Sequence, residues 1–236
     1  MPVTAARRAC DTRSNSIPGA TGLLFTQTAL CQPRPPKLTL YVRSRSRIPS
    51  AIVAAPQVRV VEGTLSDLAA LEDAMTGVDT VTSFLGAYAS LSAFLLRTTT
   101  TPIADSFSAI FSAMRAKGVR RILALSTPAF YVAPEQVPWS WWFYGFLPPF
   151  AVPQGSAEMV GIGKQLAAQE DLDWTVFRVP QLNDGAANLP VAAGLLGHDF
   201  KGTKQLSRAS MVRWVMVEMQ QGAWIKGAPV ISNHRD

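Results

Sequence analysis

The chain alternates between short apolar runs and stretches in which apolar residues recur every three or four positions. The short runs predict strands at residues 38–42, 58–62, 78–85, 119–126, 173–179 and 228–231. The longer stretches predict helices at residues 23–30, 68–75 and 156–169, from residue 102 to 118, and from residue 207 to 222. Strands that alternate with helices are typical of a parallel sheet covered on both faces. The sequence therefore predicts an α/β fold with a doubly wound parallel sheet.

Capping residues mark the ends of several of these helices. Asp67 and Ser207 stand where a helix begins, and their side chains suit an N-cap. Gly77, Gly118 and Gly222 stand where a helix ends. One helix carries an apolar stripe at helical spacing, which we expect in the core: Phe107, Ile110, Phe111 and Met114.

A glycine turn, Gly19-Ala-Thr-Gly22, precedes the first predicted helix. Glycines at such a turn let the backbone approach a pyrophosphate, and the helix N-terminus offers free N–H groups to the anion. The third position of the pattern, often glycine, is Phe25. On its own the motif is equally compatible with a simple turn. The following strand favours a dinucleotide cradle, for which we expect Gly19, Thr21, Gly22, Leu23 and Gly86 to line the cofactor.

Arginines follow the next predicted strand, at Arg43, Arg45 and Arg47. A carboxylate at this place selects the ribose 2′-hydroxyl of NAD, whereas arginines suit the 2′-phosphate of NADP. We therefore predict NADP as the cofactor, with Arg43 and Arg47 as its ligands and NAD as the weaker alternative. A solvated basic loop is the plainer interpretation.

Charge is distributed unevenly along the chain. Residues 1–60 hold nine of the 22 basic residues and one of the 16 acidic residues, which leaves 13 basic against 15 acidic elsewhere. The positive excess thus lies beside the predicted phosphate site. No basic helix or interleaving of aromatic and basic residues occurs elsewhere, so we expect no nucleic-acid partner.

The length and composition fit one folded domain. Of 236 residues, 48% are apolar and 16% charged, which suffices for a large core. We predict one NAD(P)-binding domain over residues 17–236, preceded by a disordered or artefactual segment, 1–16. His198, His234 and the two cysteines lack metal-ligand spacing. No apolar run is long enough for a membrane span, and the start has no apolar signal region, so we expect a cytoplasmic protein.

An aromatic and proline-rich stretch interrupts the pattern between residues 128 and 153. It is too short and too rich in proline to form a membrane helix. Three roles remain open: one wall of an apolar substrate pocket, a subunit contact in a homodimer, or core packing. We expect residues 128–155 and 181–236 to form a small substrate lobe.

These landmarks together resemble the atypical short-chain dehydrogenase/reductases that have an NmrA-like NAD(P)-binding domain. The resemblance covers about residues 17–233 and implies a Rossmann-like fold. More narrowly, the chain is similar to the small oxidoreductases of fungal aromatic polyketide clusters, the averufin-oxidase-like group. The segments that carry the resemblance are Gly19–Gly22, Val42-Arg43, Gly77–Asp79, Lys117–Arg121 leading to Ser126, Asp173–Pro180 and Leu206–Ala209.

The resemblance also implies catalytic roles. In active members a serine steadies the substrate oxygen, and a tyrosine four residues before a lysine transfers the proton. Ser126 matches the serine and Lys164 the lysine, but Val160 stands where the tyrosine belongs. Tyr131 or Tyr144 would have to substitute. Lys164 is equally readable as a solvated helix lysine.

The family has an apolar strand before its glycine turn, and here that place holds Thr12–Pro18, which is too polar for a central parallel strand. Either the N-terminus is an erroneous or truncated product, or the domain folds with a damaged middle.

Three functions remain open. The first is an NADP-dependent oxidoreductase acting on an apolar, aromatic secondary metabolite. The second is a non-catalytic NAD(P)-binding regulator, which the absent tyrosine favours. The third is a degenerate product that binds nothing well, which the polar first strand favours.

Overall fold

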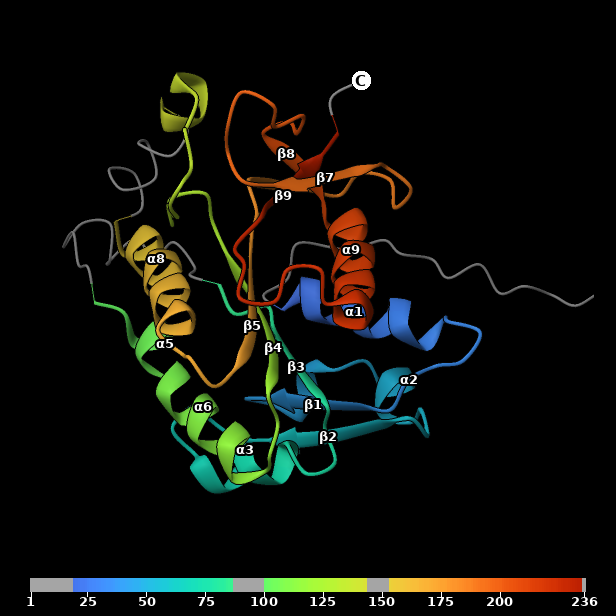
Figure 1. Cartoon of the computed structure of the whole chain (residues 1–236). Helices are drawn as coiled ribbons and strands as arrows, with labels where there is room; N and C mark the ends of the chain where they lie inside the picture. The colour runs from blue at the N-terminus through green and yellow to red at the C-terminus, as the bar shows by residue number, and fades with distance from the viewer. Residues whose placement is uncertain (1–18, 87–99, 144–152, 235–236) are drawn as a thin grey trace, which may run out of the picture.

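A computed structural model of the chain describes residues 19–86, 100–143 and 153–234 (Figure 1). Its strands are β1 (Leu38–Val42), β2 (Val58–Glu62), β3 (Thr80–Ser83), β4 (Arg121–Ser126), β5 (Asp173–Arg178), β6 (Gln181–Asn183), β7 (Val191–Gly194), β8 (Gln205–Ser207) and β9 (Val230–Asn233). Its helices are α1 (Ala20–Leu30), the 3-10 helix η1 (Arg45–Arg47), α2 (Ser50–Val53), α3 (Leu68–Ala74), α5 (Pro102–Asp105), α6 (Phe107–Ala116), α8 (Pro153–Ala167) and α9 (Arg208–Gln221). This order confirms the predicted alternation of strands and helices.

The largest sheet has the strand order β3-β4-β5-β9-β7. Its strands are parallel except β7, which runs antiparallel to β9. Helices α5, α6 and α8 lie on one face of β4 and β5, and α1 and α9 lie on the other (Figure 1). The predicted doubly wound α/β fold is thereby confirmed.

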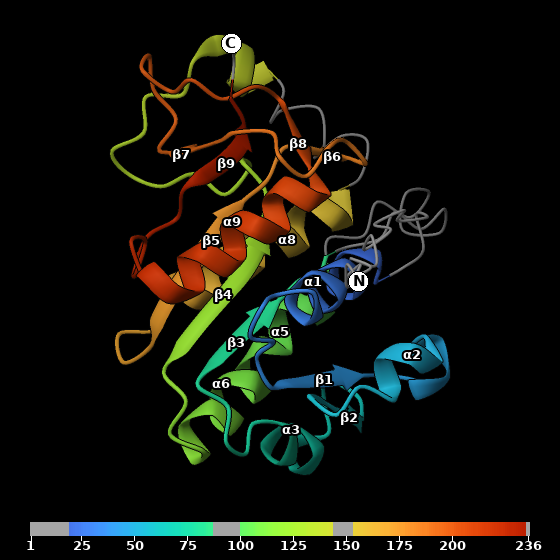
Figure 2. The same cartoon turned by 90° about the vertical axis from the view of Figure 1, so that its right-hand side faces the viewer.

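Strands β1 and β2 form a separate parallel pair, in which Leu38 stands opposite Val58 and Val42 opposite Glu62. Figure 2 shows this pair beside β3, with a different strand direction from β3 and β4. Within the described residues, no strand pairs with β1 on the side away from β2 or with β3 on the side away from β4. The segment Thr12–Pro18, where the family places its first strand, lies outside the described residues, as does the predicted N-terminal segment 1–16.

The core lies where β4 and β5 meet the helices on both faces. Ile122, Leu123, Val176 and Phe177 are fully buried in these two strands. The predicted stripe of α6 packs on one side of them, and Met211, Val212 and Val215 of α9 pack on the other. The stripe is therefore core, as predicted.

Helix ends follow the predicted capping residues. The Asp67 side chain accepts a hydrogen bond from the backbone N–H of Ala70 at 3.0 Å, and the Ser207 hydroxyl accepts one from Ser210 at 3.4 Å. The three predicted stop glycines have positive φ angles, which is the backbone region that favours glycine: Gly77, Gly118 and Gly222.

Several boundaries differ from the predictions. The strand predicted at 78–85 ends at Ser83, whose hydroxyl accepts from the Leu85 N–H at 3.3 Å and turns the backbone. The last strand begins at Val230, not residue 228, because Pro229 has no N–H to donate. The single helix predicted after residue 102 is two helices, α5 and α6, and α8 starts at Pro153, before the predicted residue 156.

Candidate functional site

The glycine turn has the backbone geometry that a phosphate cradle needs. Gly19 is the N-cap of α1 with a φ of 92°, a conformation that side chains disfavour. A Cβ atom added to Gly19 or Gly22 would meet no heavy atom of the described residues within 4 Å, so these residues leave the face of the turn open. No side chain of the described residues caps α1, so these residues leave its first-turn N–H groups available to an anion. These residues fit a dinucleotide pyrophosphate.

Phe25 explains how the turn works without a third glycine. Its ring is buried, and its centroid lies 5.4 Å from the ring of Phe84, just after β3. Phe84 in turn lies 6.0 Å from Phe177 in β5. An aromatic contact therefore fixes α1 to the sheet where a glycine would allow close backbone packing.

Two predicted phosphate ligands follow β1. Arg43 and Arg47 are exposed, and neither guanidinium forms an ion pair or a hydrogen bond with a described residue. The carboxyl end of β1 and the first turn of α1 lie on the same side of the molecule in both views (Figures 1 and 2). Unpaired positive charge therefore follows β1, where the 2′-phosphate of NADP is predicted to bind, and the role of both arginines in cofactor binding stays a prediction.

Glu62 is a residue of this site that the sequence reasoning missed. Its carboxylate accepts a hydrogen bond from the Arg45 backbone N–H at 2.8 Å. The contact holds the loop after β1 while leaving the arginine side chains free. A signal was present in the sequence, because Glu62 ends the next strand and parallel neighbours end side by side.

The other predicted cradle residues are accessible. Thr21 and Leu23 lie in the first turn of α1 and are half-buried. Gly86 follows β3, and an added Cβ would make only an ordinary contact, 3.8 Å from Leu125. Packing against the described residues therefore does not demand glycine at position 86, and the role of Gly86 in cofactor binding stays a prediction.

The predicted catalytic residues Ser126 and Lys164 have different surroundings in the described part of the chain. Ser126 is fully buried, and its hydroxyl donates to the Met159 carbonyl of α8 at 2.7 Å. Lys164 is exposed on α8, and its ammonium group forms no ion pair or hydrogen bond within the described part of the chain. Tyr144 lies outside the described residues. The hydroxyl of Ser126 therefore serves a contact between strand and helix in this structure, while Lys164 points its charge to solvent.

Tyr131 is the candidate proton donor whose surroundings can be described. It is half-exposed, at 47%. Burial, and next the negative charge of Glu135, raise the pKa of its phenol, while Arg178 acts in the opposite direction. The phenol therefore keeps its proton at neutral pH and is a donor rather than a base.

Helix α8 carries three packing residues that sequence reasoning did not single out. Glu158 is buried, and its carboxylate accepts the backbone N–H groups of Ile103 at 2.9 Å and Ala104 at 2.8 Å, which caps α5. A Cβ on Gly161 would lie 2.8 Å from Ala104, and one on Gly163 would lie 2.4 Å from the Phe130 ring. These small residues let α5 and Phe130 pack directly on α8.

A buried ion pair anchors the predicted substrate lobe. Arg178 at the end of β5 forms a bidentate pair with Glu135, and both side chains are almost fully buried. The guanidinium also donates to the carbonyls of Phe130 at 2.7 Å and Ala228 at 2.8 Å, while Glu135 accepts from Leu196 N–H at 2.8 Å. The pair joins three segments to the carboxyl end of the sheet.

The aromatic stretch divides into packed and exposed residues. Trp141 is buried against Phe200, with ring centroids 5.7 Å apart. Trp139 is 82% exposed, and Trp142 and Phe143 are about half-exposed. Core packing therefore accounts for Trp141, while a substrate wall or subunit contact stays a prediction for the others. Residues 144–152 lie outside the described residues.

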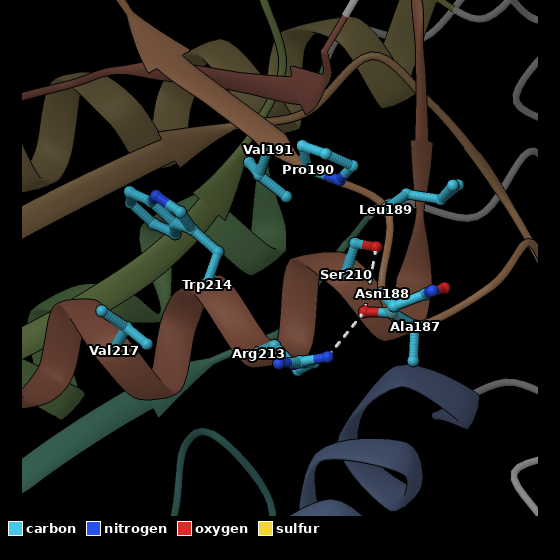
Figure 3. A pocket seen from close by; sticks show the side chains of 9 residues that line it. All are labelled: Ala187, Asn188, Leu189, Pro190, Val191, Ser210, Arg213, Trp214 and Val217. Atoms are coloured by element: carbon cyan, nitrogen blue, oxygen red, sulfur yellow. Dashed lines mark hydrogen bonds between the residues drawn. The ribbon is translucent and has the colours of Figure 1, made fainter.

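Two surface pockets are lined mainly by residues of the C-terminal third of the chain. The α9 pocket, of about 280 Å³, lies between α9 and residues 187–191 (Figure 3). The lobe pocket, of about 620 Å³, is lined among others by His198, Asp199, Lys201 and His234. Within the described ranges, no group of histidine, cysteine and acidic side chains could hold a metal ion. No helix there is long and apolar enough to cross a bilayer.

The chain belongs to the NAD(P)H-binding family, whose model matches residues 18–221. The match begins at the glycine turn and extends through α9, so it includes every element described above except β9. No curated protein matches the chain.

Solved structures share the fold at low sequence identity. A short-chain dehydrogenase/reductase from Veillonella parvula, in complex with NADP, is 20% identical over 90% of this chain and 89% of its own, with a TM-score of 0.67. The oxidoreductase ylbE from Lactococcus lactis is 15% identical over 92% and 89%, with a TM-score of 0.67. The anaerobilin reductase ChuY from Escherichia coli is 18% identical over 90% and 91%, with a TM-score of 0.64. These structures show that the chain shares their Rossmann-like α/β fold.

Proposed function

We propose that the protein is an NADP-dependent oxidoreductase that acts on an apolar, aromatic polyketide or quinone-like metabolite in secondary metabolism. The observation that carries the cofactor choice is the pair of exposed, unpaired arginines, Arg43 and Arg47, after β1. The Veillonella parvula structure, which holds NADP, supports it. The substrate class rests on the resemblance to the averufin-oxidase-like group and on the exposed aromatic residues of the lobe.

The residues of the cradle have distinct roles in this proposal. The N–H groups that follow Gly19 bind the pyrophosphate, and Arg43 with Arg47 binds the 2′-phosphate. NADPH, when bound, supplies the hydride. Lys164 orients the ribose, and Tyr131 or Tyr144 holds the proton that Val160 cannot carry.

A non-catalytic NAD(P)-binding regulator is the second candidate. The buried hydroxyl of Ser126, committed to Met159 at 2.7 Å, favours it, because a substrate oxygen would have to displace that bond. Oxidation of NADPH by a small quinone, followed at 340 nm, separates the two. Turnover supports the oxidoreductase, whereas NADP binding without turnover supports the regulator.

Replacing Arg43 tests the cofactor preference. A charge-assisted hydrogen bond contributes about 1.5–3 kcal/mol. We expect Arg43→Ala to weaken NADP binding about tenfold or more and to leave NAD binding nearly unchanged, as measured by thermal-shift titration with both cofactors. Arg34→Ala, another exposed arginine, is the matched control and should change neither. Equal losses for NADP and NAD would contradict the assignment.

Replacing Trp142 tests the aromatic residues of the lobe. If Trp142 forms a substrate wall, Trp142→Ala should raise KM for an aromatic quinone several-fold and leave the Kd of NADP unchanged. If it forms a subunit contact in a homodimer, the same change should shift the sedimentation coefficient at high protein concentration. No change in either measurement would leave Trp142 without a functional role.

A further inference from the structure

The α9 pocket combines apolar walls with one positive charge (Figure 3). Segment 187–191 forms one wall and the exposed face of α9 forms the other. Arg213 is its one charged lining residue, and no acid lines it. The apolar lining residues are Ala187, Leu189, Pro190, Val191, Trp214 and Val217.

The charge of Arg213 is not compensated. Helix α9 carries three charged residues, and two of them have partners: Arg208 pairs with Asp184 at 2.6 Å, and Glu218 with Arg121 at 2.8 Å. The Arg213 guanidinium forms no ion pair with any described residue. Among the described residues, the guanidinium donates one hydrogen bond, a long one of 3.3 Å, to the backbone carbonyl of Ala187 in the opposite wall. Most of its donors therefore remain available.

The apolar walls are exposed although their residues are large. Leu189 is 41% exposed and Val217 is 48% exposed, and both face this pocket. Trp214 is held from behind by the core, with its ring 6.4 Å from Phe177. Covering such surface is favourable at about 25 cal/mol per Å². A concave apolar surface beside a free cation suits a ligand with both features.

We propose that the α9 pocket binds a small organic anion with an apolar body, such as a medium-chain carboxylate. The carboxylate would accept hydrogen bonds from Arg213, whose planar guanidinium matches its two oxygens. The hydrocarbon would lie over Trp214 and Val217. The pocket volume, about 280 Å³, lies just below the usual range of ligand pockets, about 300–1,000 Å³. The lining residues differ from those assigned to the cofactor, so this site stands independently of the proposed function.

Octanoate and 1-octanol together test both features of the site. They share the apolar chain, and only octanoate carries charge at neutral pH. We expect octanoate to bind saturably by calorimetry and to change tryptophan fluorescence. We expect the affinity for octanol to be lower than that for octanoate by a factor of about ten or more. Equal binding of both, or no saturable binding of octanoate, would overturn the proposal.

Variants locate the binding in the α9 pocket. Arg213→Ala should weaken octanoate about tenfold and leave octanol unchanged, and Val217→Asp should abolish binding of octanoate by placing negative charge in the wall. Both residues are exposed, so the fold should survive. Arg34→Ala is the matched control, and Arg43→Ala tests the cofactor site. The site would be refuted if Arg34→Ala or Arg43→Ala lost octanoate binding. It would also be refuted if both Arg213→Ala and Val217→Asp bound octanoate as tightly as the wild type.

Discussion

Strands β1, β3, β4 and β5 all pair in parallel, but β4 and β5 have very different surroundings from β1 and β3. In β4 and β5 every residue after the first is buried, and each strand has a neighbour on both sides. β1, although its sequence is more apolar, is half-buried at all five positions and pairs only with β2 among the described residues. The comparison shows that a strand is buried by its neighbours, and that its own composition is not enough.

Backbone groups make the same point. Leu38 donates to Gln57 at 2.8 Å and Val42 accepts from Gly63 at 2.9 Å, both toward β2. Alternate residues of a parallel strand face opposite neighbours, so the backbone groups of Thr39 and Tyr41 face the free edge. No described residue bonds to them there. An open edge of this kind is a place for a further strand.

The largest expected effect is the addition of that strand. Ser14→Val, Asn15→Ile, Ser16→Val and Pro18→Val would place five apolar residues directly before Gly19. Four or five buried aliphatic side chains contribute about 1.5–3 kcal/mol each, as an upper bound. We expect the free energy of unfolding to rise on the order of 5 kcal/mol. Chemical unfolding and NADP titration should show higher stability and tighter binding.

A variant with serine at positions 14–18 is the control for this substitution. It alters the same segment but supplies no apolar side chain, so it should gain nothing. If the natural chain unfolds cooperatively at an ordinary mesophilic temperature and the apolar variant is no more stable, the free edges of β1 and β3 need no further strand.

The second effect breaks the well-packed region. Glu135→Gln leaves the buried Arg178 without its counter-charge, which typically costs about 3–5 kcal/mol. We expect the midpoint of denaturant unfolding to fall accordingly. The matched control is Asp73→Asn, which removes the exposed pair of Arg59 and Asp73 beside β2 and should change stability by less than about 1 kcal/mol. Equal losses from both variants would remove the contrast between the two regions.

The smallest effect concerns the exposed ion pair of Arg115 and Asp171, at the edge of the well-packed region. Arg115 of α6 donates two hydrogen bonds to Asp171, and these hold the pKa of that carboxyl at about 2, below its ordinary 3.8. A lowered pKa stabilises the fold above about pH 4, and this contribution disappears as the pH falls toward 2. Asp171→Asn should therefore lower Tm slightly at pH 7, and the difference from wild type should shrink on acidification.

Salt provides a further check on the Asp171 pair. Because the pair is exposed, the difference in Tm should also shrink at high ionic strength. Asp199→Asn, at an exposed acid with no partner among the described residues, should show no such difference. A difference for Asp171→Asn that persists at pH 2 would mean that the carboxylate is not its source.

Local chemistry made much of this protein readable from its sequence. The caps at Asp67 and Ser207, the stop glycines, and the apolar stripe of α6 depend on nearby residues, and the structure reproduces them. The glycine turn at Gly19 depends on backbone freedom at one position and was readable for the same reason. Alternating periodicity then fixed the α/β class.

Tertiary structure decided what depends on distant partners. The Ser126 hydroxyl donates to a carbonyl 33 positions away, and Glu135 pairs with an arginine 43 positions away. No local sequence pattern contains either contact. The partial exposure of β1 reflects its having one paired neighbour among the described residues rather than its own composition. Sequence fixes what each segment prefers to form. Packing decides which side chains lose water and which remain free to bind, because burial is shared between segments that meet only in the folded chain.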